Sequence, residues 1–97
     1  MNIEIPKETI AEFCRRNYIW RLALFGSVLR NDFSSQSDVD VLVQFEPGHT
    51  PGLAFFRMQR ELSEILGWPV DLNTEGGLSP YFRQEVLDEA EVVYVAA

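Results

Sequence analysis

The sequence predicts an α/β sandwich in which helices pack over one sheet. Segments with the apolar spacing of helices alternate along the chain with short β-branched runs, and glycine or proline separates many of them. A chain of 97 residues has room for one hydrophobic core. We therefore expect a single domain that spans residues 1–97.

Four segments are predicted to be helical. Pro6 to Asn17 opens with proline and has apolar residues at the spacing of one helix face, and Val28 to Phe33 is a shorter segment. Leu53 to Leu66 is the longest and is expected to end at a left-handed Gly67, while Tyr81 to Ala90 follows a Ser-Pro start signal. The residues expected to face the core are Ile10, Phe13 and Cys14 in the first helix, Leu53, Phe56, Leu62, Ile65 and Leu66 in the longest, and Phe82, Val86 and Leu87 in the last.

Four apolar runs are predicted to be strands. They are Arg21 to Phe25, Asp38 to Phe45, Pro69 to Asn73 and Glu91 to Val95. Successive side chains of a strand point to opposite faces of the sheet. In the second run the predicted core face consists of Val39, Val41, Val43 and Phe45, and the opposite face of Asp38, Asp40, Leu42 and Gln44.

Composition and charge exclude several classes of protein. No apolar run is long enough to cross a membrane and the N-terminus does not resemble a secretion signal, so we expect a cytoplasmic protein. The formal charge is −7, from 15 acidic residues against 8 Lys and Arg. Because this average field repels phosphate backbones, direct nucleic-acid binding is not expected. The single cysteine, Cys14, cannot form an internal disulfide and is expected to be a buried thiol.

Three aspartates interrupt otherwise apolar strands. Asp38 and Asp40 are one residue apart, so their side chains lie on the same strand face, and Asp71 lies in the following predicted strand. Carboxylates on one face repel each other unless a cation lies between them. Each aspartate alone could be an exposed residue of a half-solvated sheet, but the three together favour a metal site. Carboxylates without nearby His or Cys favour Mg²⁺ or Mn²⁺ over structural zinc.

A candidate phosphate-binding turn precedes these acids. Gly26-Ser27 follows a predicted buried strand and either forms a simple turn or presents backbone N–H groups and a hydroxyl to phosphate. Mg²⁺ is usually held jointly by carboxylates and substrate phosphates, so a nucleoside triphosphate is the expected donor. Two ions about 4 Å apart would support in-line phosphoryl or nucleotidyl transfer.

The same residues carry a resemblance to a known family. Gly26-Ser27, then Ser37-Asp38-Val39-Asp40 and the isolated strand acid Asp71, resemble the nucleotidyltransferase domain of the DNA polymerase beta superfamily. The length and the ending LSPYFRQEVLDEAEVVYV are most similar to its minimal members, the MntA-like MNT antitoxins paired with HEPN ribonuclease toxins. The resemblance covers Leu22 to Val95 and implies a palm-like domain with a mixed sheet of four to five strands.

The resemblance also implies a role for each matching position. The residues implied to bind the nucleotide are Gly26, Ser27, Arg30 and Ser37. The residues implied to bind two Mg²⁺ ions and to act in catalysis are Asp38, Asp40 and Asp71, of which Asp71 also helps to activate the acceptor hydroxyl. Where the family often has Arg-Gly-Asp, this chain has Arg30-Asn31-Asp32, and asparagine tolerates the left-handed conformation.

The activity implied by the family is transfer of AMP from ATP to a tyrosine hydroxyl of the HEPN toxin, which neutralises it within a hetero-oligomer. An acidic chain suits docking on a basic ribonuclease surface. One alternative is an antitoxin that neutralises its toxin by binding alone. A small-molecule nucleotidyltransferase is the third hypothesis, and it usually requires an added substrate domain.

Overall fold

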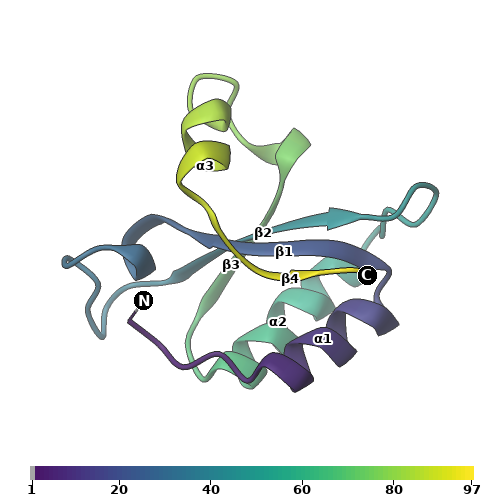
Figure 1. Ribbon diagram of the computed structural model, residues 1–97, viewed down its shortest axis with the longest axis horizontal. Helices are drawn as coiled ribbons and strands as arrows, with labels where there is room; N and C mark the ends of the chain where they lie inside the picture. Colours follow the sequence, from purple (N-terminus) through teal and green to yellow (C-terminus); the bar gives the residue numbers. More distant parts are fainter. Residues whose placement is uncertain (1) are drawn as a thin grey trace.

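The computed structural model describes residues 2–97 and consists of one sheet between unequal helical layers (Figure 1). In chain order the elements are α1 (Lys7–Arg16), β1 (Ile19–Phe25), η1 (Gly26–Leu29), β2 (Val39–Phe45), α2 (Ala54–Leu66), β3 (Val70–Thr74), η2 (Glu75–Gly77), α3 (Arg83–Glu89) and β4 (Glu91–Val95). Helices α1 and α2 lie side by side against one face, and α3 lies on the other side of the sheet. No helix within residues 2–97 is long and apolar enough to cross a membrane.

The sheet is mixed and has four strands in the order β3-β2-β1-β4. β1 is antiparallel to both β2 and β4, whereas β2 and β3 are parallel. Parallel neighbours require a crossover connection, and α2 provides it. These observations confirm the predicted α/β class and the mixed sheet.

The core lies between the sheet and the α1–α2 layer. From β2 it receives Val39, Val41 and Val43, which are all 0% exposed and confirm the predicted alternation. Each fully buried side chain of this size contributes about 1.5–3 kcal/mol of hydrophobic free energy. Cys14 of α1 is also 0% exposed, and burial raises the pKa of its thiol to about 12. The prediction of a buried thiol is confirmed.

The predicted inward face of α2 is partly wrong. Met58, Leu62 and Leu66, spaced four residues apart, are the buried residues of this helix. Phe56 is 64% exposed, because two residues from Met58 correspond to a rotation of about 200° around the axis. Leu53 is 85% exposed because it precedes the first helical turn. The predicted end of the helix is confirmed: Gly67 is left-handed, with φ of 74°.

Two short helices also differ from the prediction. The turn after β1 is a 3-10 helix that covers Gly26–Leu29 in place of the predicted Val28–Phe33, because Arg30 donates its N–H to the Ser27 carbonyl and then becomes extended. α3 begins only at Arg83, and Phe82, predicted to face inward, is 60% exposed. No residue of α3 is buried.

The outer edge of β3 is occupied by side chains of α2. The Val70 N–H donates to Ser63 Oγ at 3.0 Å, and the Leu72 N–H donates to Gln59 Oε1 at 2.9 Å. Ser63 Oγ in turn donates to the Gln59 carbonyl at 3.0 Å. Alternate N–H groups that would otherwise face solvent are therefore bonded within the chain.

Candidate active site

Asp40 and Asp71 lie opposite each other on adjacent strands. They are paired in the parallel register of β2 and β3. Asp38 immediately precedes β2 and lies two residues before Asp40. Val39 and Val41 are buried against the helices, so alternation directs the Asp40 side chain to the opposite face, where α3 lies. The structure thus brings together the three acids that the sequence singled out.

The electrostatics of Asp40 follow from this placement. Burial raises the pKa of the Asp40 carboxyl, and the negative charges of Asp71 and then Asp38 raise it further. The Arg30 guanidinium lowers the same pKa. Asp40 is half-buried, whereas Asp38 and Asp71 are exposed. A bound cation would relieve the repulsion among these neighbouring carboxylates.

The carboxylates are neighbours without forming a ready-made metal centre. Within residues 2–97, no three His, Cys, Asp or Glu side chains are gathered as ligands for one metal ion. Asp38, Asp40 and Asp71 nevertheless supply hard oxygen donors from adjacent positions, which is the donor chemistry that Mg²⁺ takes. The donor types fit Mg²⁺, and each carboxylate can rotate about its own side-chain bonds.

The turn after β1 packs directly against Asp40. Gly26 is buried and left-handed, with φ of 76°. A Cβ at this position would collide with Asp40 Oδ2 and would lie 3.3 Å from Asp40 Cγ. Only glycine therefore combines this backbone conformation with so close an approach to the carboxylate. The candidate phosphate-binding turn and the candidate metal ligands form one continuous site.

The remaining predicted nucleotide-binding residues differ in their surroundings. Ser27 is half-buried within η1. Arg30 is exposed, with its Nε 3.5 Å from Asp32 Oδ1. Ser37 closes its own loop, because its Oγ accepts the Ser34 N–H at 3.0 Å. Gly26 and Arg30 are thus brought to Asp40, while the Ser37 hydroxyl is used within the loop.

Glu89 is a site residue that the sequence pattern did not predict. Its Oε1 accepts the Gly26 N–H at 3.3 Å and lies 3.8 Å from Arg30 Nη1. The only signal in the sequence was one acid among several near the end of the chain. Glu89 could have been placed only with knowledge that β4 pairs with β1, because the pairing of Leu24 with Glu91 carries Glu89 toward Gly26.

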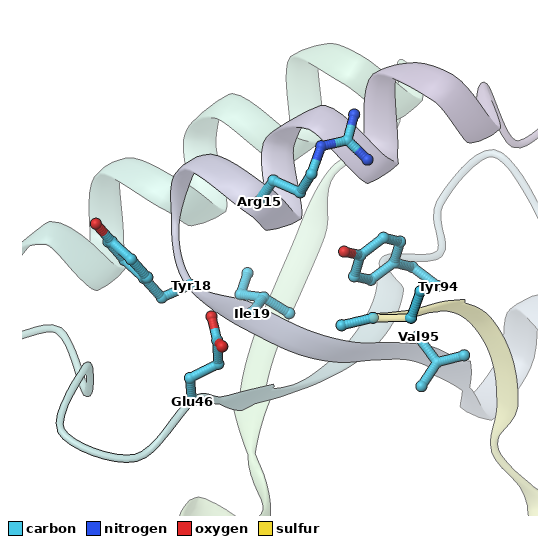
Figure 2. Close-up of a pocket in the computed structure, with 8 residues that line it drawn as sticks. Arg15, Tyr18, Ile19, Glu46, Tyr94 and Val95 are labelled. Atoms are coloured by element: carbon cyan, nitrogen blue, oxygen red, sulfur yellow. The ribbon is translucent and has the colours of Figure 1, made fainter.

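A separate pocket lies at the other end of β1 (Figure 2). Its volume is about 490 Å³. It is lined by Arg15, Tyr18, Ile19, Glu46, Tyr94, Val95, Ala96 and Ala97. Ile19 begins the seven-residue strand β1 and Gly26 follows its end, so the two regions are separated by roughly 23 Å of strand. None of the predicted site residues lines this pocket.

Comparison with known proteins identifies the family. The sequence matches the nucleotidyltransferase domain over residues 7–93. A candidate protein adenylyltransferase of Methanocaldococcus jannaschii is 36% identical over 93% of this chain and 96% of its own length. The protein adenylyltransferase MntA of Thermococcus cleftensis is 36% identical over 87% of this chain and 82% of its own.

Solved structures share the fold. A candidate minimal nucleotidyltransferase is 40% identical and superimposes with a TM-score of 0.71 over 87% of this chain and 85% of its own. A toxin–antitoxin structure with AMP-PNP has 21% identity and a TM-score of 0.74, over 95% and 75% of the two chains. A tri-AMPylated Shewanella oneidensis HEPN toxin in complex with an MNT antitoxin gives 22% identity and a TM-score of 0.66, over 93% and 70%. The chain therefore belongs to the nucleotidyltransferase domain family, is homologous to MntA protein adenylyltransferases and is a transferase enzyme.

Proposed function

We propose that residues 1–97 form one Mg²⁺-dependent nucleotidyltransferase domain that transfers AMP from ATP to a tyrosine hydroxyl of a HEPN toxin and so neutralises it. The observation that carries this proposal is the junction at Asp40, where Gly26 packs against its carboxylate and Asp71 pairs with it across the strands. Nucleotidyl transfer needs anion-binding and cation-binding groups at adjacent positions, and this junction supplies both.

Asp38, Asp40 and Asp71 would hold the Mg²⁺ ions. The ions would supply charge neutralisation at the triphosphate and on the attacking and leaving oxygens. Mn²⁺ offers similar chemistry for the same oxygen donors. The raised pKa of Asp40 is consistent with this role, because it arises first from burial and then from the negative charges of Asp71 and Asp38, which a bound cation would offset.

The chain's own groups would orient the nucleotide and the acceptor. The Gly26 N–H, the Ser27 hydroxyl and the Arg30 guanidinium would bind the triphosphate, and the Ser37 hydroxyl would join them when its loop contact opens. The acceptor oxygen forms a bond to the α-phosphorus while the bond from this phosphorus to the bridging oxygen breaks and pyrophosphate leaves. The Asp71 carboxylate would help to remove the hydroxyl proton.

The proposed partner follows from the similar antitoxins. An MNT antitoxin of the same fold occurs in a complex with an AMPylated HEPN toxin, and a related MntA is named a protein adenylyltransferase. The charge of −7 suits docking against a basic ribonuclease surface. We propose a hetero-oligomer with such a toxin, without direct binding of nucleic acid by this chain.

The test is transfer of label from ATP to a HEPN toxin purified together with this chain. With Mg²⁺, ATP labelled at the α-phosphate should label the toxin on tyrosine, and ATP labelled at the γ-phosphate should not. Asp38→Asn combined with Asp40→Asn should abolish labelling. Asp88→Asn is the matched control, because Asp88 is exposed and bonded to Gln84 on α3. Undiminished labelling by the double variant would disprove the metal assignment.

Neutralisation in cells separates catalysis from binding. The double variant should fail to protect cells from the toxin, whereas Asp88→Asn should protect them fully. If the double variant protects as well as the unmodified protein, the antitoxin acts by binding alone.

A further inference from the structure

The Glu89 carboxylate contacts two of the groups that are proposed to bind phosphate. Glu89 Oε1 accepts the Gly26 N–H at 3.3 Å and lies 3.8 Å from Arg30 Nη1. Both donors belong to the nucleotide-binding set of the proposed function, on which this inference rests. A carboxylate and a phosphate oxygen are both anionic acceptors for N–H and guanidinium groups. The Gly26 N–H cannot form a full-strength hydrogen bond with Glu89 and with a phosphate at the same time.

The backbone places Glu89 at this turn. It is the last residue of α3, and β4 begins two residues later at Glu91. Leu24 pairs with Glu91 in the antiparallel register of β1 and β4. Gly26 follows Leu24 by two residues and Glu89 precedes Glu91 by two, so this pairing brings the end of α3 close to the turn. The Glu89 side chain then completes the contact.

We propose that Glu89 is an internal competitor for the phosphate-binding turn, an autoinhibitory contact that ATP must displace. While Glu89 occupies the donors, the fraction of protein ready to bind nucleotide is reduced, and the apparent dissociation constant rises by the same factor. The contact restrains ATP binding until the nucleotide takes its place.

The surroundings of Glu89 allow this displacement. No residue of α3 is buried, so the end of this helix is not anchored in the core. The Glu89 side chain is 40% exposed and the Arg30 side chain 55% exposed, and partly exposed ion pairs are weak. One hydrogen bond with a partly exposed ion pair predicts a change of about three- to tenfold in nucleotide affinity.

The experiment measures the dissociation constant of a non-hydrolysable ATP analogue with Mg²⁺ by titration calorimetry. Glu89→Gln removes the charge at nearly constant shape and should lower the dissociation constant by about three- to tenfold. Glu85→Gln is the matched control, since it removes the same charge from an exposed position one turn earlier on α3. It should bind the analogue as the unmodified protein does.

A second measurement reports on the contact itself. The backbone amide signal of Gly26 in a ¹⁵N-correlated NMR spectrum should move on Glu89→Gln and stay in place on Glu85→Gln. It should move again in the unmodified protein when the Mg²⁺-bound analogue is added.

The outcomes separate the two proposals. If the unmodified protein binds the analogue and Glu89→Gln binds it equally or more weakly, the nucleotide site stands and the competitor proposal is overturned. An equal gain of affinity in Glu85→Gln also overturns it, because the effect would then be one of net charge. If none of the three proteins binds the analogue, the nucleotide site is refuted and the role of Glu89 falls with it.

Discussion

Asp40 of β2 and Asp71 of β3 are directly paired in the parallel part of the sheet, so two carboxylate side chains lie next to each other on neighbouring strands. Such a pair opposes folding, because bringing like charges together in a partly desolvated place costs free energy. The pKa of Asp40 is raised, first by burial and then by Asp71 and Asp38, in agreement with that cost. The like charges of the candidate site therefore destabilise the folded state, and interactions elsewhere in the fold offset this cost.

Replacing Asp40 with asparagine should stabilise the metal-free protein at neutral pH. A raised pKa means that the folded state holds the Asp40 proton more tightly than the unfolded chain does. The resulting stabilisation is complete below the ordinary value of 3.8 and is lost as pH rises through the raised folded value. Thermal unfolding without Mg²⁺ should give a higher midpoint for Asp40→Asn at pH 7, by a margin that shrinks toward pH 3.8.

The control for this stability effect is Asp88→Asn, which removes an exposed acid away from the paired strands. Its midpoint should follow that of the unmodified protein at each pH. A difference for Asp40→Asn that stays constant with pH would contradict the electrostatic explanation.

Gly26→Ala should lose AMP transfer, although its loss of unfolding free energy should be modest. A left-handed alanine costs about 1–2 kcal/mol, and its Cβ would force the Asp40 carboxylate to rotate away. Gly48→Ala is a matched control, because Gly48 has φ of 81° and nothing within 4 Å of an added Cβ. Both variants should lose similar unfolding free energy in a urea titration, but only Gly26→Ala should lose AMP transfer. Equal activity in the two would exclude the steric link between the turn and Asp40.

Mg²⁺ should stabilise the unmodified protein against heat. A ligand that binds only the folded state adds about 2.7 kcal/mol when its concentration is a hundredfold above its dissociation constant. The unfolding midpoint should rise with Mg²⁺ and return to its starting value after chelation. In Asp38→Asn combined with Asp40→Asn, the rise should disappear. A rise that persists in this double variant would place the ion elsewhere.

Leu62 and Leu53 should differ sharply when each is truncated to alanine. Leu62 is 0% exposed in the α2 layer, and Leu→Ala at such a position costs about 2–5 kcal/mol of unfolding free energy. Leu53 is 85% exposed, so the same truncation should change stability by no more than about 0.5 kcal/mol. Urea unfolding measures both. A large loss at Leu53 would contradict the observed face of α2.

The alternating pattern of β2 was predictable, whereas the face of α2 was not. Val39, Val41 and Val43 reveal their common face because a strand repeats every two residues and the polar residues Asp40 and Gln44 mark the opposite face. At the start of α2, Leu53 and Phe56 satisfy the same apolar pattern as the buried residues, and only the position of the sheet beneath the helix distinguishes them. Local patterns thus predict elements better than the contacts between them.

The candidate site likewise contains residues that could be predicted from the sequence and one that could not. The three aspartates were detectable because charge inside an apolar strand is unusual, and their convergence then required only that β2 and β3 be neighbours. Glu89 offered no such contrast, since it lies among other acids on an exposed helix. Its contact with Gly26 depends on long-range strand pairing, which a local pattern does not encode.

The side chains of Ser63 and Gln59 on the outer edge of β3 have a consequence for self-association. An incoming strand from another molecule needs open N–H groups, and those of Val70 and Leu72 are already bonded. The sheet's other edge is β4, at the far end of the strand order. A strand added at this part of β3 would have to displace the Ser63 and Gln59 side chains, so these two bonds protect the sheet edge that bears Asp71.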